Sequence, residues 1–151
     1  MLTDHHLTES GRRRALDLSL VLVDDNPMTV KLACHIFTED GWDAHGFTSA
    51  WAALEALKVF EPDLIIADYR MPEMSGPEFL LAASRIHELT PKLIMTAYED
   101  DDRVKVALRK AAVPSVSKAD GLTELLNRAR LLVAVRSSIK LKAVAAAGMA
   151  S

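Results

Sequence analysis

Polar side chains that could handle a metal ion or a phosphoryl group stand directly after four short apolar runs of this chain. They are Asp24 with Asp25, Asp68, Thr96 and Lys118. If the runs are parallel strands, their carboxyl ends meet at one rim of the sheet, which is where sites form in open α/β sheets. Three carboxylates, a hydroxyl and an ammonium at one rim predict a small acidic pocket with a fixed cation beside it.

The acidic residues of this group suit Mg²⁺, which prefers oxygen ligands in an octahedron and keeps several waters. Because Asp24 and Asp25 are adjacent, we expect one to reach the ion directly and the other through a water. A carboxylate near Mg²⁺ can attack a phosphoryl group and form an aspartyl phosphate. We expect Asp68 to be that nucleophile, since it lies between the acidic pair and the side that carries Thr96 and Lys118.

Apolar runs and helical patterns alternate from residue 19 onward, and this alternation predicts the elements that position these side chains. Strands are expected at 19–23, 42–47, 64–67, 92–95 and 113–117. Helices are expected to begin at Pro27, after a Ser49 cap, at Pro77 and at the acidic residues 99–102. The order predicts an α/β fold, with a doubly wound five-stranded parallel sheet and helices on both faces.

The last helix is expected to be longer than one small sheet can cover. We expect Asp120 to cap it and Gly148 to end it. Leu125, Leu132 and Ile139 recur at seven-residue spacing, which is a partial heptad signal. Two interpretations stay open: a dimerising or linker helix, and a helix that frays beyond residue 135.

The composition is that of one compact domain. The chain has 151 residues, of which 50% are hydrophobic and 26% are charged. Its net charge of -3 argues against direct binding of nucleic acid. No run is long enough to span a membrane and no signal-peptide core is present, so we expect a cytoplasmic protein without a membrane partner. We divide it into a tail (1–17), a domain (18–133) and a helical extension (134–151).

Residues 21–27, 62–76 and 94–97, together with Lys118, resemble the response-regulator receiver domains of two-component signalling, the CheY-like superfamily. The resemblance covers residues 19–133 and implies the flavodoxin-like, CheY-like (βα)5 fold. It implies that a histidine kinase or a histidine phosphotransfer protein phosphorylates Asp68. It also implies Mg²⁺ held by Asp25, Asp68 and the backbone carbonyl of Arg70, with Asp24 acting through a water. Thr96 and Lys118 would then contact the phosphoryl group. Such a domain is a phosphoacceptor rather than an enzyme, apart from its own phosphorylation and dephosphorylation.

Three positions depart from the pattern of that family. Ala119 stands where the family usually has a cis-proline, and a cis bond there would cost about 3 kcal/mol, so we expect a loop that is either trans or locally strained. Ser115 replaces the aromatic switch residue, which excludes a rotating ring. Tyr98 either contributes instead or shields the rim. Arg70 either reaches over the site, to affect dephosphorylation or to form a salt bridge with the acidic residues 99–102, or is solvated. We therefore expect phosphoacceptance to survive and signal propagation to be altered.

Other functions fit less well. A haloacid-dehalogenase-like phosphatase needs a second aspartate two residues after its nucleophile, and Arg70 occupies that position. A nucleotide-binding domain would have a glycine-rich turn after its first strand, and 24–27 contain no glycine. A pseudo-receiver or adaptor module stays an alternative, as do a stand-alone receiver and the first domain of a longer effector such as a cyclic-dinucleotide enzyme. A homodimer through the C-terminal helix is compatible with each of these alternatives.

Overall fold

The computed structural model describes residues 17–97 and 101–150, so most of the expected tail, together with Tyr98, Glu99 and Asp100, lies outside the described residues. Its strands are β1 (Ser19–Val23), β2 (Asp43–Phe47), β3 (Leu64–Asp68), β4 (Lys92–Thr96) and β5 (Ser115–Ser117). Its helices are α2 (Pro27–Glu39), α3 (Ala50–Leu57), α4 (Gly76–Ile86), α5 (Asp102–Ala111) and α6 (Gly121–Ala150). A 3-10 turn, η2 (Lys118–Asp120), joins β5 to α6.

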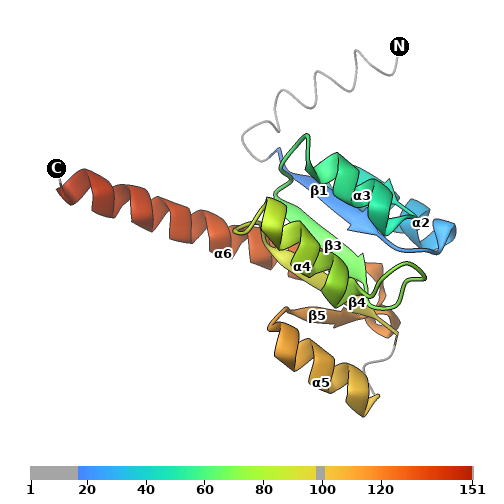
Figure 1. Cartoon of the computed structure of the whole chain (residues 1–151). Helices are drawn as coiled ribbons and strands as arrows, with labels where there is room; N and C mark the ends of the chain where they lie inside the picture. Colours follow the sequence, from blue (N-terminus) through green and yellow to red (C-terminus); the bar gives the residue numbers. More distant parts are fainter. Residues whose placement is uncertain (1–16, 98–100, 151) are drawn as a thin grey trace, which may run out of the picture.

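The strands form one parallel sheet in the order β2-β1-β3-β4-β5 (Figure 1). β1 is the first described strand, and β2 pairs with it at the edge of the sheet. β3 lies on the other side of β1, and β4 and β5 follow it in order. This order places helices on both faces, with α2 and α6 on one and α3, α4 and α5 on the other. The predicted doubly wound α/β fold with an extended C-terminal helix is confirmed.

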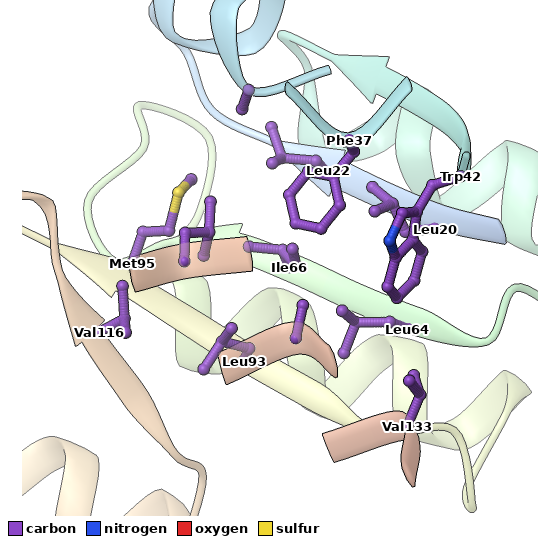
Figure 2. Close-up of a cluster of buried hydrophobic side chains, with 13 residues drawn as sticks. Leu20, Leu22, Phe37, Trp42, Leu64, Ile66, Leu93, Met95, Val116 and Val133 are labelled. Carbon is purple, nitrogen blue, oxygen red and sulfur yellow. The ribbon is translucent and has the colours of Figure 1, made fainter. Parts of the chain in front are cut away.

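Each face of the sheet has its own hydrophobic core. On the face covered by α2 and α6, residues of four strands are buried against Phe37 and the first turns of α6, as Figure 2 shows. Phe37 and Trp42 meet there edge to face, with ring centroids 5.2 Å apart. On the other side, Val21, Val23, Ile65 and Ile94 pack against α3 and α4. Because β1 and β3 are covered on both faces, they read as continuous apolar runs.

The strand bounds differ from the expected ones by a residue or two. Asp68 and Thr96 are the last residues of β3 and β4 rather than the first residues beyond them. Trp42 precedes β2, since its N–H bonds the carbonyl of Phe37 at 3.0 Å. β5 is shorter than expected and begins only after Pro114, which lacks the N–H that a ladder needs.

Side chains with the expected chemistry begin the helices. Asn26 caps α2 by accepting the N–H of Met28, and Ser49 caps α3 as expected. The start of α4 was misplaced: it begins at Gly76, one residue before Pro77, after a capping box in which Ser75 and Glu78 bond each other's backbone N–H. Within the acidic run, Asp101 caps α5.

The expected start of the last helix agrees with the observed one, whereas its expected end at Gly148 is wrong. Asp120 lies inside η2, and α6 begins after it at Gly121. Gly148 does not end α6, which continues to Ala150. A lone glycine inside a helix costs only about 1 kcal/mol, and it stops a helix only where the backbone turns left-handed.

α6 leaves the domain after its first half. Leu125, Ala129 and Val133 are buried against the sheet, whereas every residue from 137 to 148 is exposed. The helix therefore projects well beyond the sheet instead of fraying after residue 135 (Figure 1). Arg130 and Asp40 form an ion pair that joins the packed half to the end of α2.

Candidate functional site

The carboxyl ends of β1, β3 and β5 place acidic residues and a lysine around one pocket. Its volume is about 420 Å³. The described residues that line it are Asp24, Asp25, Asn26, Asp68, Arg70, Met71, Pro72, Ala97 and Lys118. Asp24 and Asp25 follow β1, Asp68 ends β3 and Lys118 follows β5. Five of the six site residues expected from the sequence thus line one pocket.

Lys118 bridges two buried carboxylates in this pocket. Its Nζ lies 2.7 Å from Asp24 Oδ2 and 3.1 Å from Asp68 Oδ1. Asp24 is fully buried and Asp68 is only 6% exposed. Buried charges need partners, and charge-assisted hydrogen bonds are the strong ones. The Asn26 N–H adds a bond to Asp24 Oδ1 at 2.9 Å, which fixes the orientation of that carboxylate.

Burial and crowding change the proton affinities of this group. Burial and the neighbouring charge of Asp24 raise the pKa of Asp68 to about 6, although the bond from Lys118 opposes the shift. Burial lowers the pKa of Lys118, but the bonds to Asp24 and Asp68 outweigh that effect and the pKa is raised overall. The lysine therefore remains a cation at neutral pH. It offsets only part of the repulsion between the carboxylates.

The three aspartates also form a set of oxygen ligands. One carboxylate oxygen each from Asp24, Asp25 and Asp68 lies within 4.8 Å of the others. Asp25 is exposed and extends the set toward solvent. An oxygen-only set that opens to water fits Mg²⁺, which keeps several of its waters. A bound cation would also offset the repulsion that raises the pKa of Asp68.

Thr96 takes a different place from the other predicted residues. It is buried, 1% exposed, at the end of β4, where its Cα pairs with that of Ser117 on β5. Its neighbour Ala97 lines the pocket, but Thr96 is not among the described lining residues. Its backbone is therefore placed at the rim, on the strand next to the one that carries Asp68.

Gly76 is a site residue that the sequence reading treated only as part of a loop. A Cβ on Gly76 would lie 2.4 Å from the backbone carbonyl oxygen of Asp68. The Gly76 N–H also bonds the Tyr69 carbonyl at 2.7 Å, so the loop after β3 folds back onto the strand end. The Pro- and Gly-bearing composition of 71–76 signalled a loop, but only the fold reveals this close approach.

The two residues beside the site that depart from the family pattern, Ala119 and Ser115, each take part in a backbone hydrogen bond. No described peptide bond is cis, so the Lys118–Ala119 bond is trans, the first of the two expected alternatives. The Ala119 N–H bonds Ser117 Oγ at 3.0 Å. Ser115 is half-buried on β5, and its carbonyl accepts a bond from Arg128 Nη2 of α6 at 3.5 Å.

The fold and the rim together define a doubly wound α/β domain with an acidic site at the carboxyl ends of its strands. A family model described as "Response regulator receiver domain" matches residues 20–130. The chain belongs to this family, the receiver domains of two-component response regulators, which are signalling domains.

Known relatives differ in how much of their own length this chain covers. The regulatory protein AtoC of Escherichia coli is 32% identical over 125 residues, which are 80% of this chain and 27% of AtoC. The chain thus spans about a quarter of that regulator. The sporulation initiation phosphotransferase F of Bacillus subtilis is 24% identical over 119 residues, 79% of this chain and 96% of that protein.

Solved structures show the same fold. A CheY-like receiver domain from Methanospirillum hungatei superposes with a TM-score of 0.73 at 19% identity, covering 80% of this chain and 97% of that one. Within the described part of the chain, no helix combines the length and the apolar character that crossing a membrane requires.

Proposed function

We propose that this domain accepts a phosphoryl group on Asp68 from the phosphohistidine of a histidine kinase or a histidine phosphotransfer protein, in a Mg²⁺-dependent reaction. The observation that carries the proposal is the bridge from Lys118 to Asp24 and Asp68 in an open acidic pocket. A structural role alone would not require two buried carboxylates and a lysine beside a pocket that solvent and a donor can enter.

In the transfer, an oxygen of the Asp68 carboxylate attacks phosphorus. The P–N bond to the donor imidazole breaks, its electron pair returns to the imidazole nitrogen, and the phosphoryl group becomes an acyl phosphate. Lys118 is already bound to Asp68 and would pair with a phosphoryl oxygen. Mg²⁺, held by Asp24, Asp25, Asp68 and the backbone carbonyl of Arg70, would neutralise part of the charge on those oxygens. We assign Thr96 the hydroxyl contact.

Labelling with acetyl phosphate tests the nucleophile. We expect Asp68→Asn to abolish labelling, because the amide nitrogen replaces the attacking oxygen and the charge is lost. Asp17→Asn, an exposed change outside the pocket, should label like the wild-type protein. Equal labelling of Asp68→Asn and the wild-type protein would contradict the proposal.

A second candidate is a pseudo-receiver or adaptor that binds partners without phosphorylation. Ser115 and Ala119 favour it, since both replace residues typical of the family. The bridged acidic pocket favours the phosphoacceptor instead. The wild-type protein decides between them: the absence of labelling and of Mg²⁺ binding at millimolar Mg²⁺ would favour the adaptor.

The signal would leave through partner contacts or through α6. Beyond residue 136, α6 exposes Ile139, Leu141 and Val144. We propose that this part, the extension 134–151 that follows the domain 18–133, pairs with a second copy or leads into a further domain. The mass of the protein in solution with and without beryllofluoride tests the first alternative. In this account the domain is a cytoplasmic phosphoacceptor, not an enzyme with a separate substrate.

A further inference from the structure

Two hydrogen bonds hold the turn that carries Lys118, one at each end of η2. Ser117 is the last residue of β5, where it pairs with Thr96, and it is also the N-cap residue of η2. There Ser117 Oγ accepts the Ala119 N–H at 3.0 Å. At the other end, the Gly121 N–H bonds the Lys118 carbonyl. Gly121 has φ 88°, a left-handed conformation that favours glycine.

The position of the Lys118 ammonium depends on the conformation of the backbone that carries it. Lys118 borders a pocket of about 190 Å³ between α2 and α6, whose walls are mostly apolar and include Leu32, Val116 and Leu125. Figure 2 shows Val116 with Met95 at this end of the core. An open space beside a flexible four-carbon stem leaves the stem incompletely packed. The turn therefore determines where the ammonium meets Asp24 and Asp68.

The hydrogen bond inside the turn requires particular residues at two positions. Residue 119 must have a backbone N–H, which proline lacks. Residue 117 must have a side-chain acceptor, which serine provides in the manner of a helix cap. Ser117 and Ala119 thus form one hydrogen-bonded turn, which joins the last residue of β5 to the residue after the lysine.

We propose that Ser117 is a positioning residue for Lys118: through the Ala119 N–H its hydroxyl fixes the turn from which the ammonium reaches Asp24 and Asp68. The inference rests on the proposed function, because it concerns phosphoryl transfer to Asp68. It adds a residue outside the acidic pocket, since Ser117 is not among the described residues that line it.

The test compares initial rates of labelling by acetyl phosphate with Mg²⁺ present. Ser117→Ala should label roughly fivefold more slowly, the factor that corresponds to one net hydrogen bond. Ser117→Thr keeps the hydroxyl and should restore the rate. Ser49→Ala is the matched control, because Ser49 makes the same kind of bond, to the Ala52 N–H at 3.3 Å, at the start of α3. It should label at the wild-type rate.

A double-mutant comparison separates positioning from a general loss of structure. Lys118→Ala should label slowly, and Ser117→Ala in that background should slow it no further, because the residue to be positioned is gone. A further slowing of the same size would overturn the inference, as would a wild-type rate for Ser117→Ala or an equally slow Ser49→Ala. If Lys118→Ala itself labels at the wild-type rate, the proposed role of Lys118 fails and the inference fails with it.

Discussion

Lys118 Nζ lies 2.7 Å from Asp24 Oδ2, although 94 residues separate them in the chain. The contact joins the loop after β1 to the turn after β5, across the carboxyl ends of β3 and β4. It is possible only because the doubly wound sheet brings all strand ends to one rim. The same ammonium also reaches Asp68, so one cation serves two carboxylates and leaves the pocket with excess negative charge.

The burial of Asp68 and the negative charge of Asp24 beside it predict how stability depends on pH. In the folded, metal-free protein the pKa of Asp68 is about 6, against 3.8 for an ordinary aspartate. Between these values the folded state binds more protons than the unfolded state, so the free energy of unfolding falls as pH rises and the loss is complete above pH 6. Asp68→Asn resembles the protonated form and should be more stable at pH 7.5, by roughly 1–2 kcal/mol.

Urea denaturation in EDTA at pH 4 and pH 7.5 measures this difference. The curves of Asp68→Asn and the wild-type protein should converge at pH 4, whereas Asp17→Asn should follow the wild-type protein at both pH values. A variant that is less stable than the wild-type protein at pH 7.5 would show that the carboxylate is stabilising there.

Magnesium should stabilise the folded protein by binding the aspartate cluster. A ligand that binds only the folded state adds about 1.4 kcal/mol at tenfold excess over its Kd. Asp25→Asn should weaken this effect, because Asp25 is one of the three clustered ligands. Fluorescence of Trp51 should report binding, since Trp51 is exposed in the first turn of α3, just beyond the carboxyl end of β2, whereas Trp42 is buried and precedes the other end of that strand.

Trp51→Phe should therefore remove the fluorescence response to Mg²⁺ and keep the stabilisation. Equal stabilisation of Asp25→Asn and the wild-type protein at every Mg²⁺ concentration would exclude Asp25 as a ligand.

The close approach of Gly76 to Asp68 predicts a strong effect of one methyl group. In Gly76→Ala the Cβ would meet the Asp68 carbonyl oxygen at 2.4 Å, so the loop after β3 must shift. We expect a loss of about 1–3 kcal/mol in the free energy of unfolding and slower labelling of Asp68. Gly148→Ala is the control: its Cβ meets no described atom within 4 Å, and alanine favours the helix. Equal stability of the two variants would contradict the contact.

The exposed half of α6 should contribute little to the stability of the domain. Deletion of 137–151 removes residues that are exposed wherever they are described, so the free energy of unfolding should change by less than about 0.5 kcal/mol. Leu125→Ala, in the packed half, should cost about 2–5 kcal/mol. Guanidinium denaturation below any dimerising concentration compares the two. A large loss on deletion would mean that the extension packs on the domain.

The fold could be predicted because its central strands are buried on both faces and therefore appear as separate apolar runs. Once the order of strands and helices is known, few topologies remain. Asp24, Asp25, Asp68 and Lys118 could be grouped for the same reason, since each follows or ends a run. Their grouping needed only the rule that parallel strands share a rim.

What the sequence did not reveal depends on backbone geometry and tertiary contact. α6 begins directly after Asp120, but the sequence did not reveal the 3-10 turn over Lys118–Asp120, which Gly121 ends with a positive φ. Gly148 looks like a stop, yet the backbone stays helical there. The contact of Gly76 with Asp68 joins residues of a strand and a helix, and no local pattern encodes that distance.

The location of the phosphoryl group tests the assignment of Asp68 as the phosphoacceptor most directly. The protein is labelled with acetyl phosphate and Mg²⁺, reduced with borohydride to trap the acyl phosphate, digested with trypsin and mapped by mass spectrometry. We predict modification of Asp68 alone, in the peptide that ends at Arg70, and none in Asp68→Asn. Modification at Asp24 or Asp25 with an unmodified Asp68, or none in the wild-type protein, would contradict that assignment.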